Sequence, residues 1–321
     1  MAIVISLDHG NKMMKGHSCA FTSGYVECGH LPTMDSDVLL YEGKEYALSD
    51  RRVIQKNDKT EDESYLILTL FAIGKELLAR NQAATAEKPV DIELLAGLPP
   101  LHYKAMHKKF EQYFTSDARQ FNFELNRQPM SIKIVKTHVF PQAYAAALTI
   151  YEQIKDSPIV NIVDIGGYTA DCIQLENVHG LGLRANMDIC TSLYLGVNSL
   201  FKKINEQVRA TGAQNIRDSV IENILCEDNN SLEHYSKARV ELIKKEARKF
   251  SMEVLAEVAH TGLDLSEDIT VFVGGGSMLL KKYLEQGGKT TKSIFVDDLF
   301  ANVKGYQIIY EAQKSALQKT S

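Results

Sequence analysis

The sequence predicts an α/β protein with two lobes of related design, and three observations lead to this fold class. Short apolar runs typical of strands alternate with longer segments of helical periodicity. The 321 residues, 45% of them hydrophobic, exceed one domain of about 100 to 200 residues. The stretch AIVISLDHG is also echoed by PIVNIVDIG, which aligns Asp8 with Asp164, 156 residues apart and close to half of the chain. Each aspartate ends a predicted strand two residues before a glycine, Gly10 or Gly166.

The first lobe opens on a strand at residues 2–8, and the segments 22–29 and 38–49 are typical of further antiparallel strands, the second with a turn at Glu42–Gly43. After a charged loop, Ser64 begins an apolar helix that runs to about Arg80. The remaining elements expected in this lobe are strands at 90–99 and 131–140, and a helix at 141–154 whose first turn suits Pro141.

The second lobe begins with the strand at 158–167 and resumes with an apolar strand that carries Asp171. A long helical region is expected to follow, interrupted at 209–215 and at 226–231. The later elements are expected to be a helix at 235–260, a strand at 268–276, a helix at 277–286, a strand at 292–298 and a helix from about 304. We place domain I at 1–157 and domain II at 158–298, and we expect 299–321 to return to domain I.

Composition excludes several classes of function. The net charge of −5 and the pI near 6.0 disfavour direct binding of nucleic acid or anionic lipid. The five cysteines form no CxxC pair and are odd in number, which favours a reducing cytoplasm over a disulfide framework. The N-terminal apolar run ends at Asp8 without a basic region before it, which indicates a strand and not a signal peptide. No apolar run reaches the ~20 residues of a membrane span, so a cytoplasmic protein without membrane contact is expected.

Three glycine-containing turns, at Gly10, Gly166 and Gly274–Gly276, contain the candidate residues for binding phosphate and metal. Glycine past a strand end tolerates unusual backbone angles and lets backbone N–H groups approach a phosphate closely. Aspartate at the strand end adds a hard oxygen ligand for Mg²⁺, usually through metal-bound water because magnesium dehydrates reluctantly. The third turn, Gly274 to Gly276, follows an apolar strand and precedes a helix, whose N-terminus suits an anionic ligand.

These residues resemble the motifs of the actin-like ATPase superfamily, which includes actins, Hsp70 ATPase lobes and sugar kinases. LDHGNKMMK (7–15) is similar to the first phosphate motif, PQA (141–143) to the first connecting motif, VDIGGYTAD (163–171) to the second phosphate motif and FVGGGSM (272–278) to the adenosine motif. They occur in the order of the family. LLAGLPPLHY (94–103), YLGVNSL (194–200) and the retained Asp171 resemble most closely the plasmid-segregation actins of the ParM type.

The resemblance implies a fold of two lobes, each an RNase H-like domain, with the nucleotide in the cleft between them. It implies that Asp8 and Asp164 position Mg²⁺ through water, and that Gln142 and Asp171 orient the attacking water. The nucleotide that it implies is ATP, with GTP as the alternative. The residues that it places around this nucleotide are Gly10, Asn11, Lys12 and Lys15 in the first loop, Gly166, Gly167 and Tyr168 in the second, and Gly274, Gly275, Gly276, Ser277 and Met278 in the third.

Two departures from the family pattern affect the mechanism. Asn11 and Lys12 stand where the family usually has small or hydroxyl residues, so phosphate contacts there are expected to differ. Gln142 stands where the best-known ParM has glutamate and actin has glutamine. A neutral amide can orient a water but cannot take its proton, so the lytic step is expected to resemble that of actin.

The resemblance further implies head-to-tail assembly into dynamic filaments that segregate plasmid DNA, with DNA held by a separate adaptor of the ParR type. Heterologous contacts that do not close generate such filaments. Two alternatives remain open: a small-molecule kinase of the same fold, for which Asp171 is the available carboxylate base, and a passive filament that binds nucleotide without turnover.

Overall fold

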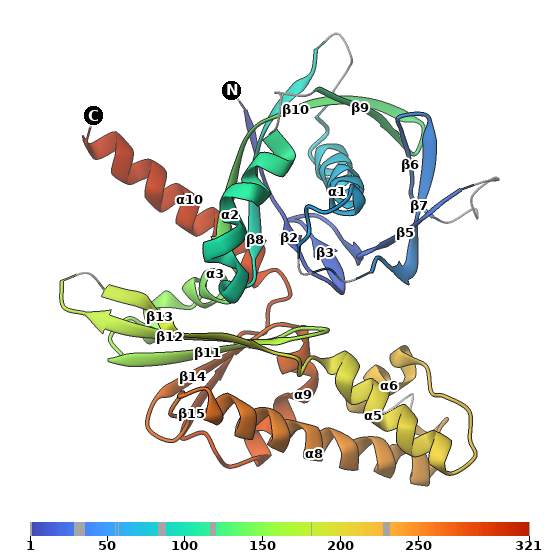
Figure 1. Ribbon diagram of the computed structural model, residues 1–321, viewed down its shortest axis with the longest axis vertical. Coiled ribbons are helices and arrows are strands. Elements are labelled where there is room, and N and C mark those ends of the chain that lie inside the picture. The colour runs from blue at the N-terminus through green and yellow to red at the C-terminus, as the bar shows by residue number, and fades with distance from the viewer. Residues whose placement is uncertain are drawn as a thin grey trace. The chain divides into compact units, whose positions relative to one another are not determined.

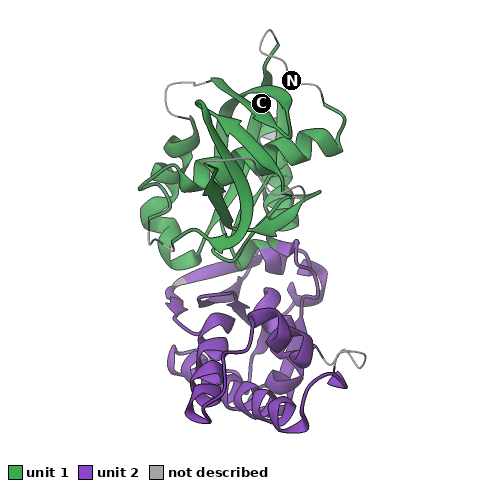
Figure 2. Ribbon diagram, turned by 90° about the vertical axis from the view of Figure 1, so that its right-hand side faces the viewer, with its two compact units in different colours: residues 1–145, 302–321 green, residues 146–301 purple. Residues whose placement is uncertain are grey.

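The computed structural model describes residues 2–28, 36–54, 56, 58–82, 88–115, 120–180, 182–226 and 232–320. The chain divides into two compact units (Figure 2), unit 1 with residues 1–145 and 302–321 and unit 2 with residues 146–301. Packing therefore divides the chain after residues 145 and 301, whereas the sequence places the domain boundaries after 157 and 298.

Unit 1 is built on a mixed sheet of seven strands in the order β1-β8-β10-β9-β6-β7-β5. The first three strands are parallel, and the later neighbours pair antiparallel. The strands are β1 (Ile3–Ser6), β5 (Gly24–Glu27), β6 (Val38–Tyr41), β7 (Lys44–Arg52), β8 (Val90–Leu98), β9 (Gln120–Leu125) and β10 (Gln128–Pro141). A separate sheet of three short strands follows β1 directly: β2 (Asp8–His9), β3 (Met13–Lys15) and β4 (Ala20–Thr22).

Helix α1 (Ser64–Ala79) lies within the curve of this sheet (Figure 1), and it is apolar on nearly all sides because the sheet and its neighbours cover it. Helix α2 (Pro100–Thr115) packs on β8 and β10 and places Phe110 and Phe114 in the same core. Helix α10 (Ala301–Thr320) covers the opposite face, where Leu95 of β8 points away from the core side chains of Leu94 and Ala96.

Two contacts fix α10 on the sheet. The Tyr310 hydroxyl donates to Glu93 Oε2 at 2.8 Å, and His138 Nε2 lies 3.3 Å from the same oxygen. The ring of Tyr306 lies directly over Gly97, where an added Cβ would come within 1.9 Å of the tyrosine oxygen. Gly97 of the LLAGLPP stretch is therefore required by the close approach of α10.

Unit 2 contains a sheet of five strands in the order β13-β12-β11-β14-β15. Its strands are β11 (Ile159–Ile165), β12 (Ala170–Val178), β13 (Gly182–Leu193), β14 (Ile269–Val273) and β15 (Lys292–Phe295). Its helices are α4 (Tyr151–Ile154), α5 (Val197–Ala210), α6 (Asp218–Leu225), α8 (Lys237–His260) and α9 (Gly275–Gln286), while α3 (Tyr144–Leu148) spans the division between the units. The apolar sides of α5, α6, α8 and α9 form one core with one face of β11, β12 and β14.

Three sequence-based expectations are wrong in detail. Pro141 ends β10 and does not begin a helix, because Gln142 and Ala143 form a turn in which Ala143 has φ +60°. Residues 182–193, expected within a helical region, form the edge strand β13, and the apolar–polar alternation of LRANMDI (183–189) is in fact typical of a strand. Helix α2 begins at Pro100, where the sequence indicated only the end of a strand.

In the part of the chain that the structure describes, no helix is long and apolar enough to cross a membrane.

We expect Gly97→Ala to lower the free energy of unfolding by about 1–3 kcal/mol, because the new methyl group would overlap the Tyr306 ring. Urea unfolding followed by circular dichroism measures this change. Gly275→Ala is the matched control, since its Cβ would meet only Leu299 at an ordinary 3.5 Å. Equal stability of the Gly97→Ala protein and the parent would contradict the packing described for α10.

Candidate functional site

The Asp8 carboxylate is the centre of the arrangement in unit 1. It is 2% exposed at the start of β2, two residues after the parallel strand β1 ends. Lys15 Nζ lies 3.0 Å from Asp8 Oδ2, and Gln142 Nε2 donates to Asp8 Oδ1 at 2.7 Å. Three predicted site residues from three separate segments therefore meet at one carboxylate.

The electrostatics of this cluster keep Asp8 ionised. Burial raises the pKa of the carboxyl, but the charge and hydrogen bond of Lys15 and the charge of Lys59 outweigh it, so the pKa lies below its usual value of 3.8. The adjacent His9 is fully buried, and burial together with the charge of Lys59 lowers its pKa to about 3. The imidazole is thus neutral at physiological pH, and Asp8 remains the negative partner of Lys15.

The first glycine turn is held tightly by its own neighbours. An added Cβ at Gly10 would lie 2.5 Å from the carbonyl oxygen of Met13, so this position requires glycine. Ser23 Oγ donates to the Gly10 carbonyl at 2.6 Å, and the Tyr65 hydroxyl donates to Asn11 Oδ1 at 2.8 Å. Lys12 is half-buried at the far end of the turn. These contacts hold the backbone of the turn in one conformation, which fixes the directions of its N–H groups.

Gln142 is positioned by the end of β10. Its backbone N–H donates to the Leu98 carbonyl at 2.8 Å, and the next residue, Ala143, donates to Asn302 Oδ1 at 3.1 Å. These contacts direct the side chain to Asp8, where it is 7% exposed. The expected role of Gln142 is to orient water; the structure shows in addition that its amide orients the Asp8 carboxylate.

The second glycine turn lies between β11 and β12 of unit 2. Gly166 N–H donates to the Thr169 carbonyl at 2.8 Å, and residues 166–169 are partly exposed. The first residues of α5 hold the turn from behind, since the N–H groups of Gly196, Val197 and Asn198 donate to the carbonyls of Tyr168, Gly166 and Gly167 at 3.1, 3.1 and 2.9 Å. An added Cβ at Gly196 would lie 2.4 Å from the Gly167 carbonyl, which explains the glycine of YLGVNSL.

The two aspartates of this unit are cross-strand neighbours. Asp164 of β11 pairs directly with Asp171 of β12, which places both side chains on the same face of the sheet. Asp171 is 6% exposed and accepts a hydrogen bond from the Ser192 hydroxyl of β13. Like charges in such a pair destabilise a sheet unless a cation lies close by.

The third glycine turn is shaped by Asp164. Gly274 has φ +86°, and its missing Cβ leaves room for Asp164 Oδ1, which would lie only 2.2 Å from such an atom. Gly276 similarly approaches the Ile165 carbonyl, and α9 begins at the exposed Gly275. The second and third predicted motifs are therefore in direct contact within unit 2.

A cavity of about 250 Å³ lies beside the third turn. Met278 forms part of its wall, whereas Ser277 is fully buried. The other lining residues are Leu225, Cys226, Leu279, Lys281, Lys282 and Glu285.

The donor set fits magnesium held through water. Among the described residues, no group of three or more His, Cys, Asp or Glu side chains is arranged to hold a metal directly. Magnesium keeps several of its waters and needs only one or two carboxylates from a protein. Asp8 and Asp164 are the carboxylates that would hold such a hydrated cation, and Asp171 lies beside Asp164 on the same face of the sheet.

Two family models match the chain. A model described as "Actin like proteins N terminal domain" matches residues 14–144, and one described as "Archaeal actin homologue MreB-like, C-terminal" matches residues 162–286. The chain belongs to the actin-like proteins. No curated protein sequence matches it significantly.

Solved structures share the whole fold of this actin-like chain. The archaeal actin homologue Ta0583 is 14% identical with a TM-score of 0.77, and the alignment covers 97% of this chain and 99% of that one. The 15-stranded ParM filament from Clostridium botulinum is 16% identical with a TM-score of 0.76, with the same coverage. The Alp12 filament structure is 15% identical with a TM-score of 0.63, covering 97% and 98%. The expected two-lobed actin-like fold is confirmed.

Sequence reasoning missed the residues that support the glycine turns of this actin-like chain. Ser23, Tyr65 and Ser192 contact site residues through side chains that carry no motif of their own. Gly196 lies in a stretch that the resemblance singled out, yet its contact with the second turn follows only from the fold.

We expect Lys15→Met to lower the free energy of unfolding at pH 7 by roughly 2–3 kcal/mol, because it removes the cation bound to a buried carboxylate. The lowered pKa of Asp8 stabilises the parent above pH 3.8, and that contribution is lost as pH falls through the folded-state pKa. The difference between the two proteins should therefore shrink below about pH 3.8, as urea unfolding at several pH values would show.

Lys44→Met is the matched control for this experiment. Lys44 pairs with Glu27 at 3.5 Å in an exposed position, so its replacement should change stability by no more than about 0.5 kcal/mol. A Lys15→Met effect as small as that of the control, or independent of pH, would contradict the role assigned to the Lys15–Asp8 pair.

Proposed function

We propose that this actin-like chain binds Mg²⁺-ATP, hydrolyses it and assembles head to tail into dynamic filaments in the cytoplasm that segregate plasmid DNA. The observation that carries the proposal is the convergence of Lys15 and Gln142 on the ionised Asp8. Ta0583, 14% identical, has been solved as a complex with ADP, with a TM-score of 0.73, which supports a nucleotide as the ligand.

In the proposed mechanism both glycine turns serve one nucleotide, and the protein acts by positioning and by charge. Bound magnesium neutralises phosphate oxygens and supplies ordered water. Asp8 and Asp164 accept hydrogen bonds from that water, while Lys15 neutralises a β- or γ-phosphate oxygen. The N–H groups of the first and second turns donate to the phosphates. Gln142 and Asp171 orient the attacking water. Its oxygen bonds to the γ-phosphorus as the bond from that phosphorus to the β-phosphate oxygen breaks, and its proton passes to the released phosphate.

The third turn is assigned to the nucleoside. Met278 contributes to the wall of the 250 Å³ cavity, and Leu225 and Leu279 add apolar surface of the kind that packs on a base. The start of α9 adds backbone N–H groups at Gly275 and Gly276.

Uneven charge supports assembly through unlike surfaces. Unit 1 has 20 basic and 19 acidic residues, whereas unit 2 has 16 basic and 22 acidic ones. A contact from unit 1 of one copy to unit 2 of the next therefore brings a nearly neutral surface to an acidic one and avoids repulsion between two acidic units. The net negative charge also suits a chain that meets DNA through a separate ParR-type adaptor.

The geometry does not favour the kinase alternative. A general base must reach a substrate hydroxyl. Asp171, the carboxylate considered for this role, is 6% exposed and bound by Ser192.

Light scattering, checked by electron microscopy, tests the proposed function with ATP, ADP and no nucleotide. We expect filaments with ATP and their loss as ATP is consumed, and we expect higher salt to change the extent of assembly. Polymer that forms equally without nucleotide would show a passive filament. Release of ADP that depends on an added sugar, without polymer, would show a kinase.

We expect Gln142→Ala to retain Mg²⁺-ATP binding and to slow phosphate release by roughly 10²-fold or more, because the variant cannot hold the attacking water. Calorimetry measures the binding and a phosphate assay measures turnover. Gln153→Ala, at an exposed position of α4, is the matched control and should turn over like the parent. Unchanged turnover in Gln142→Ala would remove this residue from the mechanism.

A further inference from the structure

A lysine is buried behind the first glycine turn. Lys59, in the loop between β7 and α1, is 6% exposed. Its ammonium donates to the backbone carbonyl of His9 and lies 5.0 Å from the centre of the Tyr65 ring. Removing an ammonium group from water costs several kcal/mol unless other groups compensate it. A buried lysine therefore requires a structural or functional explanation.

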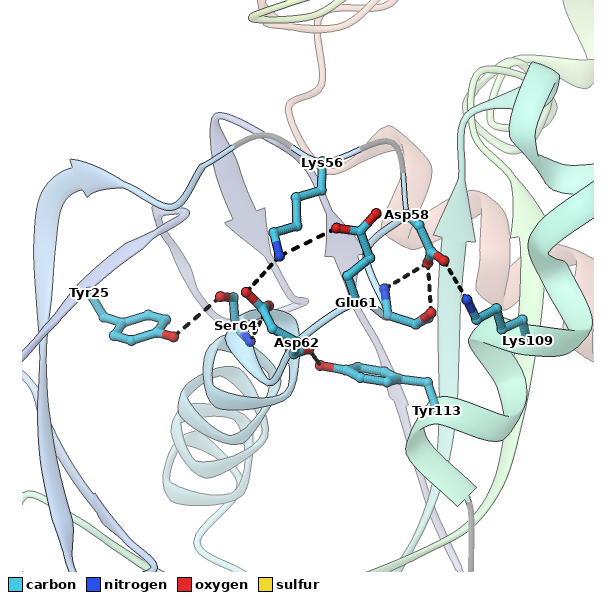
Figure 3. Close-up of polar contacts among 9 residues, drawn as sticks. Tyr25, Lys56, Asp58, Glu61, Asp62, Ser64, Lys109 and Tyr113 are labelled. Atoms are coloured by element: carbon cyan, nitrogen blue, oxygen red, sulfur yellow. Dashed lines mark hydrogen bonds and ion pairs between the residues drawn. The ribbon is translucent and has the colours of Figure 1, made fainter.

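The loop that carries Lys59 is fixed on both sides. Asp58 accepts from Lys109 of α2 and from the backbone and hydroxyl of Thr60. Figure 3 shows Lys109 directed at Asp58, and Tyr113 of the same helix directed at the backbone of Asp62. These contacts engage the Asp58 carboxylate and hold the loop against α2.

The carbonyl that Lys59 contacts belongs to the peptide group that joins His9 to Gly10. The His9 C=O and the Gly10 N–H are parts of the same planar, trans peptide, so they point in opposite directions. A cation at the carbonyl fixes the direction of the Gly10 N–H and increases its partial positive charge. Gly10 is one of the residues assigned to the phosphates.

Three further contacts that hold this turn are between neutral groups. Thr69 Oγ1 lies 2.9 Å from His9 Nε2, the Tyr65 hydroxyl binds Asn11, and Ser23 binds the Gly10 carbonyl. Among these four contacts, only that of Lys59 brings a charge, and only that of Lys59 acts on the peptide between His9 and Gly10.

We propose that Lys59 is a positioning residue that orients the His9–Gly10 peptide and places a second positive charge behind the phosphate site. It acts on the nucleotide through the Gly10 N–H and does not touch the nucleotide itself. The inference rests on the proposed nucleotide-binding function, and it makes the affinity for phosphate depend on a side chain outside every recognised motif.

The test compares Lys59→Met, Lys59→Gln and Lys59→Arg with the parent. We expect Lys59→Met to weaken Mg²⁺-ATP binding about 10-fold or more in calorimetry and to leave adenosine binding within about 2-fold, because the lost interaction acts on phosphate. Lys59→Arg should recover much of the loss, and Lys59→Gln, which keeps a donor without the charge, should fall between. Lys56→Met is the matched control, since Lys56 pairs with Asp62 on the outside of the same loop.

A second readout needs no nucleotide. The amide ¹⁵N chemical shift of Gly10 reports a hydrogen bond to the carbonyl of its own peptide, so it should move in Lys59→Met and not in Lys56→Met. An unchanged Gly10 shift, or equal loss of ATP and adenosine affinity, would overturn the inference. If the parent binds no nucleotide, the proposed function fails, and the Gly10 shift still decides whether Lys59 orients this peptide.

Discussion

A buried carboxylate is stable only if nearby groups compensate its negative charge. The way in which the partners of Asp8 do this determines how the candidate site residues of unit 1 are arranged. Lys15 and Gln142 both bind it, one from β3 and the other from the end of β10. The lysine brings the returning strand of the first turn to the aspartate, and the glutamine brings the last residues of the sheet core. The same interactions that stabilise the buried charge therefore bring together three of the residues that we propose act on phosphate.

The aspartate of unit 2 that corresponds to Asp8, which is Asp164, has different surroundings. Asp164 has a second carboxylate, Asp171, as its cross-strand neighbour, and it occupies the space that a side chain at Gly274 would take. Asp8 is thus bound by a lysine and an amide, whereas Asp171 of the pair in unit 2 accepts a hydrogen bond from the Ser192 hydroxyl.

Sequence reasoning predicted the fold unevenly, and the site residues that it named stay predictions. The strand-end aspartates, the glycine turns and the order of the motifs are local signals, and strands such as β8 and β14 are marked by apolar runs with clear ends. Edge strand β13 was missed although apolar and polar residues alternate through LRANMDI (183–189), which is the sequence signal of a strand with one buried face. Lys59 could not be found, because an isolated lysine in a charged loop resembles a surface residue until the fold buries it.

The most direct test of the central claim is calorimetric titration of Mg²⁺-ATP into a protein carrying both Asp8→Asn and Asp164→Asn. The account holds that these two carboxylates, one in each unit, hold the metal–nucleotide complex, so affinity should fall by roughly 100-fold or more while the fold is retained. An affinity equal to that of the parent would contradict it.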